Sequence, residues 1–239
     1  MENKLSRAFV SEWVCPENKC ITLPLEEDGT YDFSVVPRSK FTRVIVSSAT
    51  LPNSLCLTHL VRPFYVSLHG QEWGDGHRDR VTVYTQATHR YESQGEYTIT
   101  IRGIIVGWRF GEIDDSEVDR SGGCRNNLLN IAQWGCLRLG NKGAYFAGCK
   151  KFRCNAKDAL DLKDTTNLAS MFRGASSFTS DLSAWQTGQV NNMRDMFYDA
   201  SSFTSDLSAW QTGQVTDMSD MSLFAVVSIL FTSLAQINS

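Results

Sequence analysis

The stretch that decides the fold is ASSFTSDLSAWQTGQV, residues 175–190, because the same sixteen letters return at residues 200–215. The period is 25 residues, and Met171, Met196 and Met221 keep it on either side of the identical blocks. A fixed period of this length is typical of stacked supersecondary units, each too small to bury its own apolar face. The sequence therefore predicts an array of repeats in this part of the chain.

Weaker copies of the unit precede the identical blocks. MFRGA at 171–175 stands one period before MFYDA at 196–200. A fainter copy, YFAGC at 145–149, precedes MFRGA by 26 residues. We therefore expect the repeats to extend over residues 127–221.

Each unit is expected to have two halves. Val190, Met193 and Phe197 are spaced by 3 and 4 residues, which predicts one face of a short helix. A Ser- and Asp-rich stretch follows, with one short strand expected at Asp206–Gln211. Stacking predicts ladders of identical side chains, and we interpret the periodic apolar residues as the core: Met171, Phe172, Phe178, Leu182, Trp185, Val190, Met193, Met196, Phe197, Phe203, Leu207, Trp210, Val215 and Met218.

The unit resembles a surface-protein repeat seen in mycoplasmas, many bacteria and some algae, the BspA-like group of leucine-rich-repeat relatives. The form of that family is close to MFxGASSFNQDLSSWDTSNVTNMSxMF, and this chain reads MFRGASSFTSDLSAWQTGQVNNMRDMF from Met171 to Phe197. The resemblance implies a short leucine-rich-repeat-like α/β solenoid in a cell-surface or extracellular interaction protein. The family offers no catalytic residue to transfer.

The N-terminal part of the chain predicts β structure. ITLPL at 21–25 and YDFSV at 31–35 alternate in polarity, which indicates a hairpin with Asp28-Gly29 at its turn. Further strands are expected from Val81, over 97–101 and over 104–110, with a turn at Gly95.

Two motifs in this part resemble a polycystic-kidney-disease-type (PKD-like) domain, whose form is VDWGDG…HxYxxxGxYTVxxxG. They are WGDG, a structural turn made of Trp73, Gly74, Asp75 and Gly76, and the pair His89 and Tyr91. The resemblance implies an antiparallel β-sandwich over 15–111. We interpret Asp75 as a residue that holds its own turn through backbone hydrogen bonds. A bound cation is the alternative, but no further carboxylates stand at calcium-loop spacing.

The predicted fold class is therefore α+β, a PKD-like antiparallel β-sandwich followed by the solenoid. Three segments differ from both. Residues 36–71 contain no acid, and joining their flanks gives YDFSV-EWGDG, which indicates an insert, either a retained intron or a lineage-specific insertion. Residues 112–126 predict an acidic linker. The uncharged tail 222–239 is expected to cap the last repeat, with a membrane anchor through 222–237 as the alternative.

The composition is that of an ordinary globular chain. Of its 239 residues 42% are hydrophobic and 21% charged, and the formal net charge of −3 offers no basic excess for nucleic-acid binding. No apolar run of signal-peptide length lies within the first thirty residues. Seven cysteines are too few for a disulfide-built scaffold of this size, and an odd number leaves at least one unpaired.

The motifs of common enzyme classes are missing from the sequence, including H-E-x-x-H, G-x-S-x-G, C-x-x-C and the Walker loop. We therefore expect a non-enzymatic protein for surface recognition or adhesion, with no cofactor and no metal, and with an unknown protein or glycan partner. A glycan-binding module and a membrane-anchored surface protein are the alternatives. The expected binding face consists of polar residues that either contact a ligand or merely solvate the repeats: Asp181, Ser183, Gln186, Asp206, Ser208 and Gln211.

Overall fold

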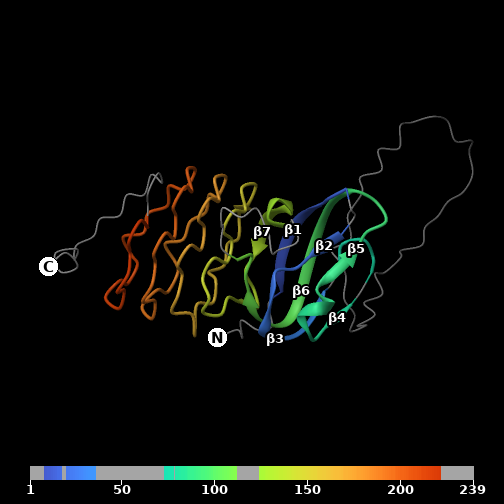
Figure 1. Ribbon diagram of the computed structural model, residues 1–239, viewed down its shortest axis with the longest axis horizontal. Helices are drawn as coiled ribbons and strands as arrows, with labels where there is room; N and C mark the ends of the chain where they lie inside the picture. The colour runs from blue at the N-terminus through green and yellow to red at the C-terminus, as the bar shows by residue number, and fades with distance from the viewer. Residues whose placement is uncertain (1–7, 18–19, 36–72, 78, 112–123, 222–239) are drawn as a thin grey trace, which may run out of the picture.

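The computed structural model of the protein describes residues 8–17, 20–35, 73–77, 79–111 and 124–221 (Figure 1). The insert 36–71, most of the predicted linker and the tail 222–239 lie outside these residues. Two 3-10 turns, η2 (Tyr84–Gln86) and η3 (Cys124–Asn127), accompany the strands. The strands are β1 (Phe9–Cys15), β2 (Cys20–Thr22), β3 (Leu25–Val35), β4 (Arg80–Val81), β5 (Thr88–Arg90), β6 (Gly95–Trp108), β7 (Leu128–Gln133), β8 (Leu137–Arg138) and β9 (Arg153–Cys154).

Most of these strands belong to a single sheet. Its order is β4-β3-β6-β1-β7-β9, and β8 pairs with β6 beside this path. The long strand β6 lies between β3 and β1 and is antiparallel to both. β2 and β5 form a separate two-stranded sheet, with Ile21 opposite His89. The expected β-sandwich therefore fits only in part, because one sheet has seven strands and the other has two.

The predicted hairpin with Asp28-Gly29 at its turn is wrong. β3 is continuous through these residues and pairs with β6, with Leu25 opposite Trp108 and Thr30 opposite Val106. Between these two pairs β3 has more residues than β6, so the ladder is irregular there. A β-bulge of this kind admits a glycine without ending the strand. The stretches 97–101 and 104–110, predicted as separate strands, likewise contribute to one strand, β6, because Gly103 does not interrupt it.

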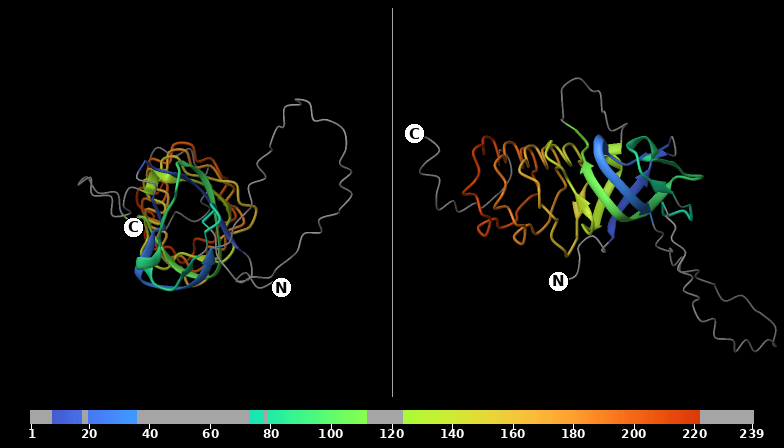
Figure 2. Two further views of the ribbon diagram at one scale, coloured as in Figure 1. Left: turned by 90° about the vertical axis from the view of Figure 1, so that its right-hand side faces the viewer. Right: turned by 90° about the horizontal axis from the view of Figure 1, so that it is seen from below.

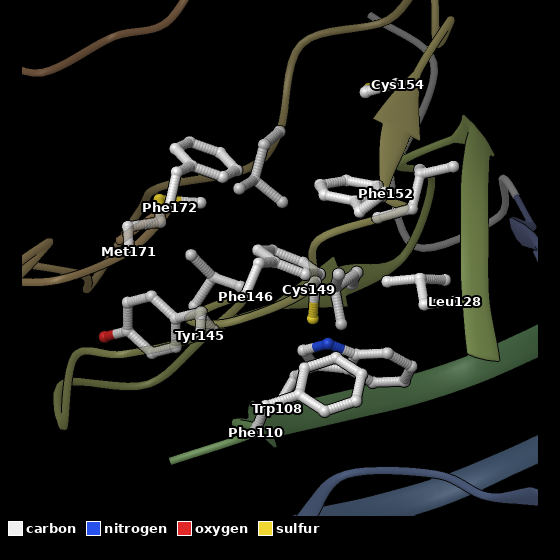
Figure 3. Close-up of a cluster of buried hydrophobic side chains, with 14 of the residues drawn as sticks. Trp108, Phe110, Leu128, Tyr145, Phe146, Cys149, Phe152, Cys154, Met171 and Phe172 are labelled. Carbon is white, nitrogen blue, oxygen red and sulfur yellow. The ribbon is translucent and has the colours of Figure 1, made fainter. Parts of the chain in front are cut away.

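The sheet continues into the repeats. β7, within the residues predicted as repeats, pairs antiparallel with β1 and parallel with β9. Trp108 and Phe110, at the end of β6, face Phe146 at centroid distances of 6.5 and 6.3 Å (Figure 3). The buried apolar residues of the sheet and of the repeats therefore form one core.

Backbone hydrogen bonds join each repeat to the next. Leu168, Ser170, Phe172 and Gly174 donate their amides to carbonyl oxygens of the following repeat. The amides that follow Ser170, Phe172 and Gly174, those of Met171, Arg173 and Ala175, donate instead to the carbonyl three residues earlier in the same repeat. The same alternation recurs one period later, and the repeats lie above one another when viewed along the molecule (Figure 2).

The predicted fold class is wrong for the repeats, because no α-helix occurs in any described part of the chain. Ser170 and Asp195 have φ of 54° and 53°, in the left-handed region. Gly174 and Asp199 follow four residues later with φ of 67° and 57°. Two left-handed residues in each repeat cannot continue a right-handed helix, so this half is a series of tight turns. An α/β solenoid of the leucine-rich-repeat type is therefore not what the chain forms.

The short strand predicted at Asp206–Gln211 is also wrong. The strand-like contacts between repeats are isolated parallel bridges, which join Asn167 to Asn192 and Asn192 to Asp217. Thirteen of the fourteen predicted core residues are buried, and Met218 is partly buried. Trp185 lies over Trp210 with ring centroids 6.4 Å apart and planes inclined by 7°, while Phe172 stacks on Phe197 at 5.7 Å.

Candidate functional site

A polar groove of about 640 Å³ crosses three successive levels of the repeats. We call it the hydroxyl groove, because Thr and Ser side chains supply half of its lining. Equivalent residues line it in rows one period apart. It is lined by Cys154, Asn155, Lys157, Thr179, Ser180, Asp181, Ser183, Thr204, Ser205 and Asp206.

Three of the six residues predicted for a binding face line this groove, namely Asp181, Ser183 and Asp206. Gln186, Ser208 and Gln211 are not among its lining residues. The structure thus brings half of the predicted face together and adds residues that sequence reasoning missed, Thr179, Ser180, Thr204 and Ser205 among them. Their repetition after 25 residues was the signal that could have found them.

The two aspartates of the groove have defined local roles. The Asp181 carboxylate accepts a hydrogen bond from the Ser183 amide at 2.9 Å, and Asp206 accepts one from the Ser208 amide at 2.9 Å. Hydrogen bonds from Ser183, first from its side chain and then from its amide, lower the pKa of Asp181. The Ser208 amide and hydroxyl likewise lower the pKa of Asp206. Both groups are therefore firmly ionised at neutral pH.

Cys154, one of the residues that line the groove, is buried, and this burial raises the pKa of its thiol. A thiolate is the nucleophilic form of cysteine, so a raised pKa leaves Cys154 largely in the unreactive form. The six cysteines within the described ranges form no disulfide with one another, and four of them lie in the repeats or in η3: Cys124, Cys136, Cys149 and Cys154. Nothing in the lining of the groove therefore resembles an activated nucleophile.

A second polar cluster lies in the sheet half of the molecule, around the WGDG turn. Asp75 Oδ2 is 2.8 Å from His89 Nε2 and 3.3 Å from His77 Nδ1. Asp75 Oδ1 also accepts a hydrogen bond from the His77 amide at 3.0 Å, as expected for a residue that holds its own turn. Sequence reasoning considered a cation at Asp75 alone and took His89 only as part of the His-x-Tyr pair, so it did not place His77 and His89 beside Asp75.

Aromatic packing fixes this cluster. Trp73 stacks on the His89 imidazole at 4.9 Å with planes inclined by 8°, and Tyr91 donates a hydrogen bond to the Trp73 carbonyl at 3.0 Å. Burial raises the pKa of the Asp75 carboxyl, but hydrogen bonds from His89 and the His77 amide outweigh it, so the pKa of Asp75 lies below its ordinary value. Asp75 is therefore held as a carboxylate.

Residues 120–228 match a family described as "Mycoplasma protein of unknown function, DUF285". No curated protein and no solved structure matches the chain. The family match covers the repeats and not the N-terminal sheet, and its description assigns no function. Among the residues that the structure describes, no helix has the length and apolar character needed to cross a membrane.

Proposed function

We propose that this chain is a non-enzymatic recognition protein that binds an extended polar ligand in the hydroxyl groove. The observation that carries the proposal is the groove itself, in which Thr179, Ser180 and Asp181 are repeated as Thr204, Ser205 and Asp206. Rows of identical groups suit a ligand that itself repeats or extends along the stack.

The chemistry of the lining supports a polar ligand. Hydroxyls both donate and accept hydrogen bonds, the two carboxylates accept them, and Lys157 adds one cation. None of the ten lining residues is aromatic, leucine or arginine, whereas Trp, Tyr and Arg dominate the binding energy of protein–protein interfaces. This lining favours a glycan as a second candidate beside an extended protein segment.

Location at a cell surface and a role in adhesion are parts of the proposal. They are supported by the resemblance of the repeat unit to BspA-like surface proteins, which is an argument from analogy. The family match over residues 120–228 is compatible with this location.

The test is a comparison of ligand binding by the wild-type chain and by Asp181→Asn/Asp206→Asn, on a glycan array and on a panel of surface-protein ectodomains. Asparagine keeps an oxygen acceptor for the turn amide and removes both charges from the groove. Asp217→Asn is the matched control, because Asp217 makes the same turn contact, to the Ser219 amide at 3.0 Å, but does not line the groove.

We expect the double variant to lose at least about fivefold in affinity for any ligand that the wild-type chain binds. A hydrogen bond to a charged group contributes about 1.5–3 kcal/mol and one between neutral groups about 0.5–1.5 kcal/mol, so each substitution should cost about 1 kcal/mol. Asp217→Asn should bind as the wild type does. Equal binding by all three chains would place the ligand elsewhere and overturn the role of the hydroxyl groove.

A further inference from the structure

We infer that Asp75, His77 and His89 form a binding site for a divalent transition-metal ion of the zinc type. We call it the turn site, since two ligands come from the WGDG turn and its end and the third from β5. β5 lies at the end of the molecule away from the repeats, so the turn site is separate from the hydroxyl groove (Figure 1). The inference departs from the expectation that the chain holds no metal, and it does not rest on the proposed function.

The positions of the three donor atoms fit an ion. One atom from each of Asp75, His77 and His89 lies within 4.8 Å of the others. Zinc binds imidazole nitrogen and carboxylate oxygen at about 2.0–2.2 Å in tetrahedral geometry, which places two ligand atoms roughly 3.4 Å apart. The 3.3 Å between Asp75 Oδ2 and His77 Nδ1 already matches this separation. The 2.8 Å to His89 Nε2 needs to open by only about half an ångström.

A carboxylate stands behind the buried ligand. His89 presents Nε2 to Asp75, and its other nitrogen, Nδ1, lies 3.7 Å from Asp79 Oδ2. Asp79 Oδ2 is itself held by the Trp73 indole N–H at 2.6 Å. Histidine ligands in metal sites commonly direct their second nitrogen to a carboxylate, which fixes the tautomer and the ring orientation. The 3.7 Å separation is longer than a hydrogen bond, so the Trp73 stack is what orients the His89 ring before any ion arrives.

Two ligands are prearranged and the third is free to close over an ion. The side chains of His89 and Asp75 are 9% and 13% exposed, whereas that of His77 is 62% exposed. An ion can therefore enter from the His77 side and be covered by that imidazole. Three protein ligands leave one position of the tetrahedron for water or a fourth donor.

The donor set selects the class of ion. Ca²⁺ and Mg²⁺ take oxygen ligands, and the turn site offers two nitrogens against one carboxylate group. Imidazole suits zinc, copper and nickel. A bound ion would add a further connection between the turn at 73–77 and β5, which the Asp75–His89 contact and the Trp73–His89 stack already join. Because it would bind the folded chain only, it would also raise the melting temperature.

The experiment titrates the reduced, chelator-treated full chain with ZnCl₂ and follows the heat of binding. Three chains are compared: the wild type, His77→Gln and the control His59→Gln/His69→Gln. The control removes the two other histidines of the sequence. His77→Gln alters a largely exposed side chain and keeps the Asp75–His89 contact, so the fold should be unaffected. CoCl₂ replaces ZnCl₂ in a parallel titration, and its absorption spectrum distinguishes nitrogen and oxygen ligands from thiolates.

We expect one equivalent of Zn²⁺ to bind the wild type and the control alike. His77→Gln should bind at least about tenfold more weakly, as losses in metal-site ligation typically cause. The Co²⁺ spectrum should lack a thiolate charge-transfer band, and CaCl₂ should give no binding. Imidazole proton resonances of the wild type, followed by NMR, provide a measurement without variants: two of the four histidines should shift together with one equivalent of Zn²⁺.

Several results would overturn the inference. The first is that His77→Gln binds zinc as tightly as the wild type does. The second is that the His59→Gln/His69→Gln control no longer binds zinc. A thiolate band with Co²⁺ would assign the ion to the cysteines. Absence of any binding to the wild type would leave the cluster as a hydrogen-bonded turn only. The hydroxyl groove is not altered in any of these chains, so these results leave the proposed function untouched.

Discussion

Asp181, Asp206 and Asp217 each accept a hydrogen bond from the backbone amide two residues later. Asn167 and Asn192, two periods and one period before Asp217, make the same contact with the amides of Ala169 and Arg194. Aspartate and asparagine therefore serve the same turn, and they differ in charge and in their response to acid.

This equivalence predicts how the chain responds to acid. Hydrogen bonds from Ser183, Ser208 and Ser219 lower the pKa of Asp181, Asp206 and Asp217 in the folded chain. A carboxyl with a lowered folded pKa contributes stability above its ordinary pKa of about 3.9, and that stability is lost as the pH falls through the lower folded pKa. The melting temperature should therefore fall below about pH 4.

The matched variant is Asp181→Asn/Asp206→Asn/Asp217→Asn, which keeps the acceptors and removes the titrating groups. Its melting temperature, measured by circular dichroism from pH 6 downward, should fall less steeply than that of the wild type. If the melting temperatures of the two chains fall equally as the pH is lowered, these three carboxylates do not cause the loss of stability in acid.

At the scale of the element, the sequence predicted the spacing of the buried residues in each repeat correctly, but it predicted a short helix where the chain forms tight turns. Val190, Met193 and Phe197 are buried on one side, as the spacings of 3 and 4 require. Consecutive tight turns return side chains to one side at nearly the same spacing as a helix, so periodicity could not separate the two. The left-handed residues could have separated them, because Gly148, Gly174 and Asp199 occupy equivalent positions.

Asp199 tests this explanation. It is exposed and has φ of 57°, where its counterparts Gly148 and Gly174 have φ of 72° and 67°. Glycine relieves the left-handed strain but gives the unfolded chain more freedom, so Asp199→Gly should raise the free energy of unfolding by about 0.5 kcal/mol.

Asp199→Ala is the comparison, because alanine has neither the freedom of glycine nor a polar side chain that bonds locally. It should lower the free energy of unfolding by about 0.5 kcal/mol. Denaturant titration of the two variants measures both values. Equal free energies of unfolding for Asp199→Ala and Asp199→Gly would mean that residue 199 does not keep its left-handed backbone conformation in solution.

The candidate sites were predictable to different degrees. The groove combines side chains one period apart, so the repeat alone predicted three of its five aspartate and serine residues, Asp181, Ser183 and Asp206. The turn site joins Asp75 to His89, fourteen residues away on another strand. The pairing of β2 with β5 and the stack of Trp73 on His89 fix that position, and no local spacing encodes it.

At the scale of the whole molecule, one of the contacts between the sheet and the repeats is a close approach of two backbones. Gly135, which follows β7, has φ of 51°, and a Cβ built there would overlap the backbone of Ala8 just before β1. Its amide donates to Asp158 Oδ2 at 2.8 Å, which fixes the turn. The join between the two halves therefore depends on a residue without a side chain.

Gly135→Ala should accordingly lower the free energy of unfolding of the full chain by about 2 kcal/mol, because overpacking against backbone forces a shift. Gly213→Ala is the matched control, since nothing lies within 4 Å of its added Cβ. That substitution should change stability by less than about 0.5 kcal/mol. Equal stability of the two variants would mean that β1 does not pack against the repeats as the structure shows.

The alternating amides have an evolutionary consequence. Since one set closes turns within a repeat and the other reaches the next repeat, each boundary between units is made by the backbone and is the same at every level. The identical blocks at 175–190 and 200–215 are natural partners for unequal recombination. Gain or loss of 25 codons would lengthen or shorten the groove by one step and keep the same backbone contacts between neighbouring repeats, so the length of the groove can change between generations without a new fold.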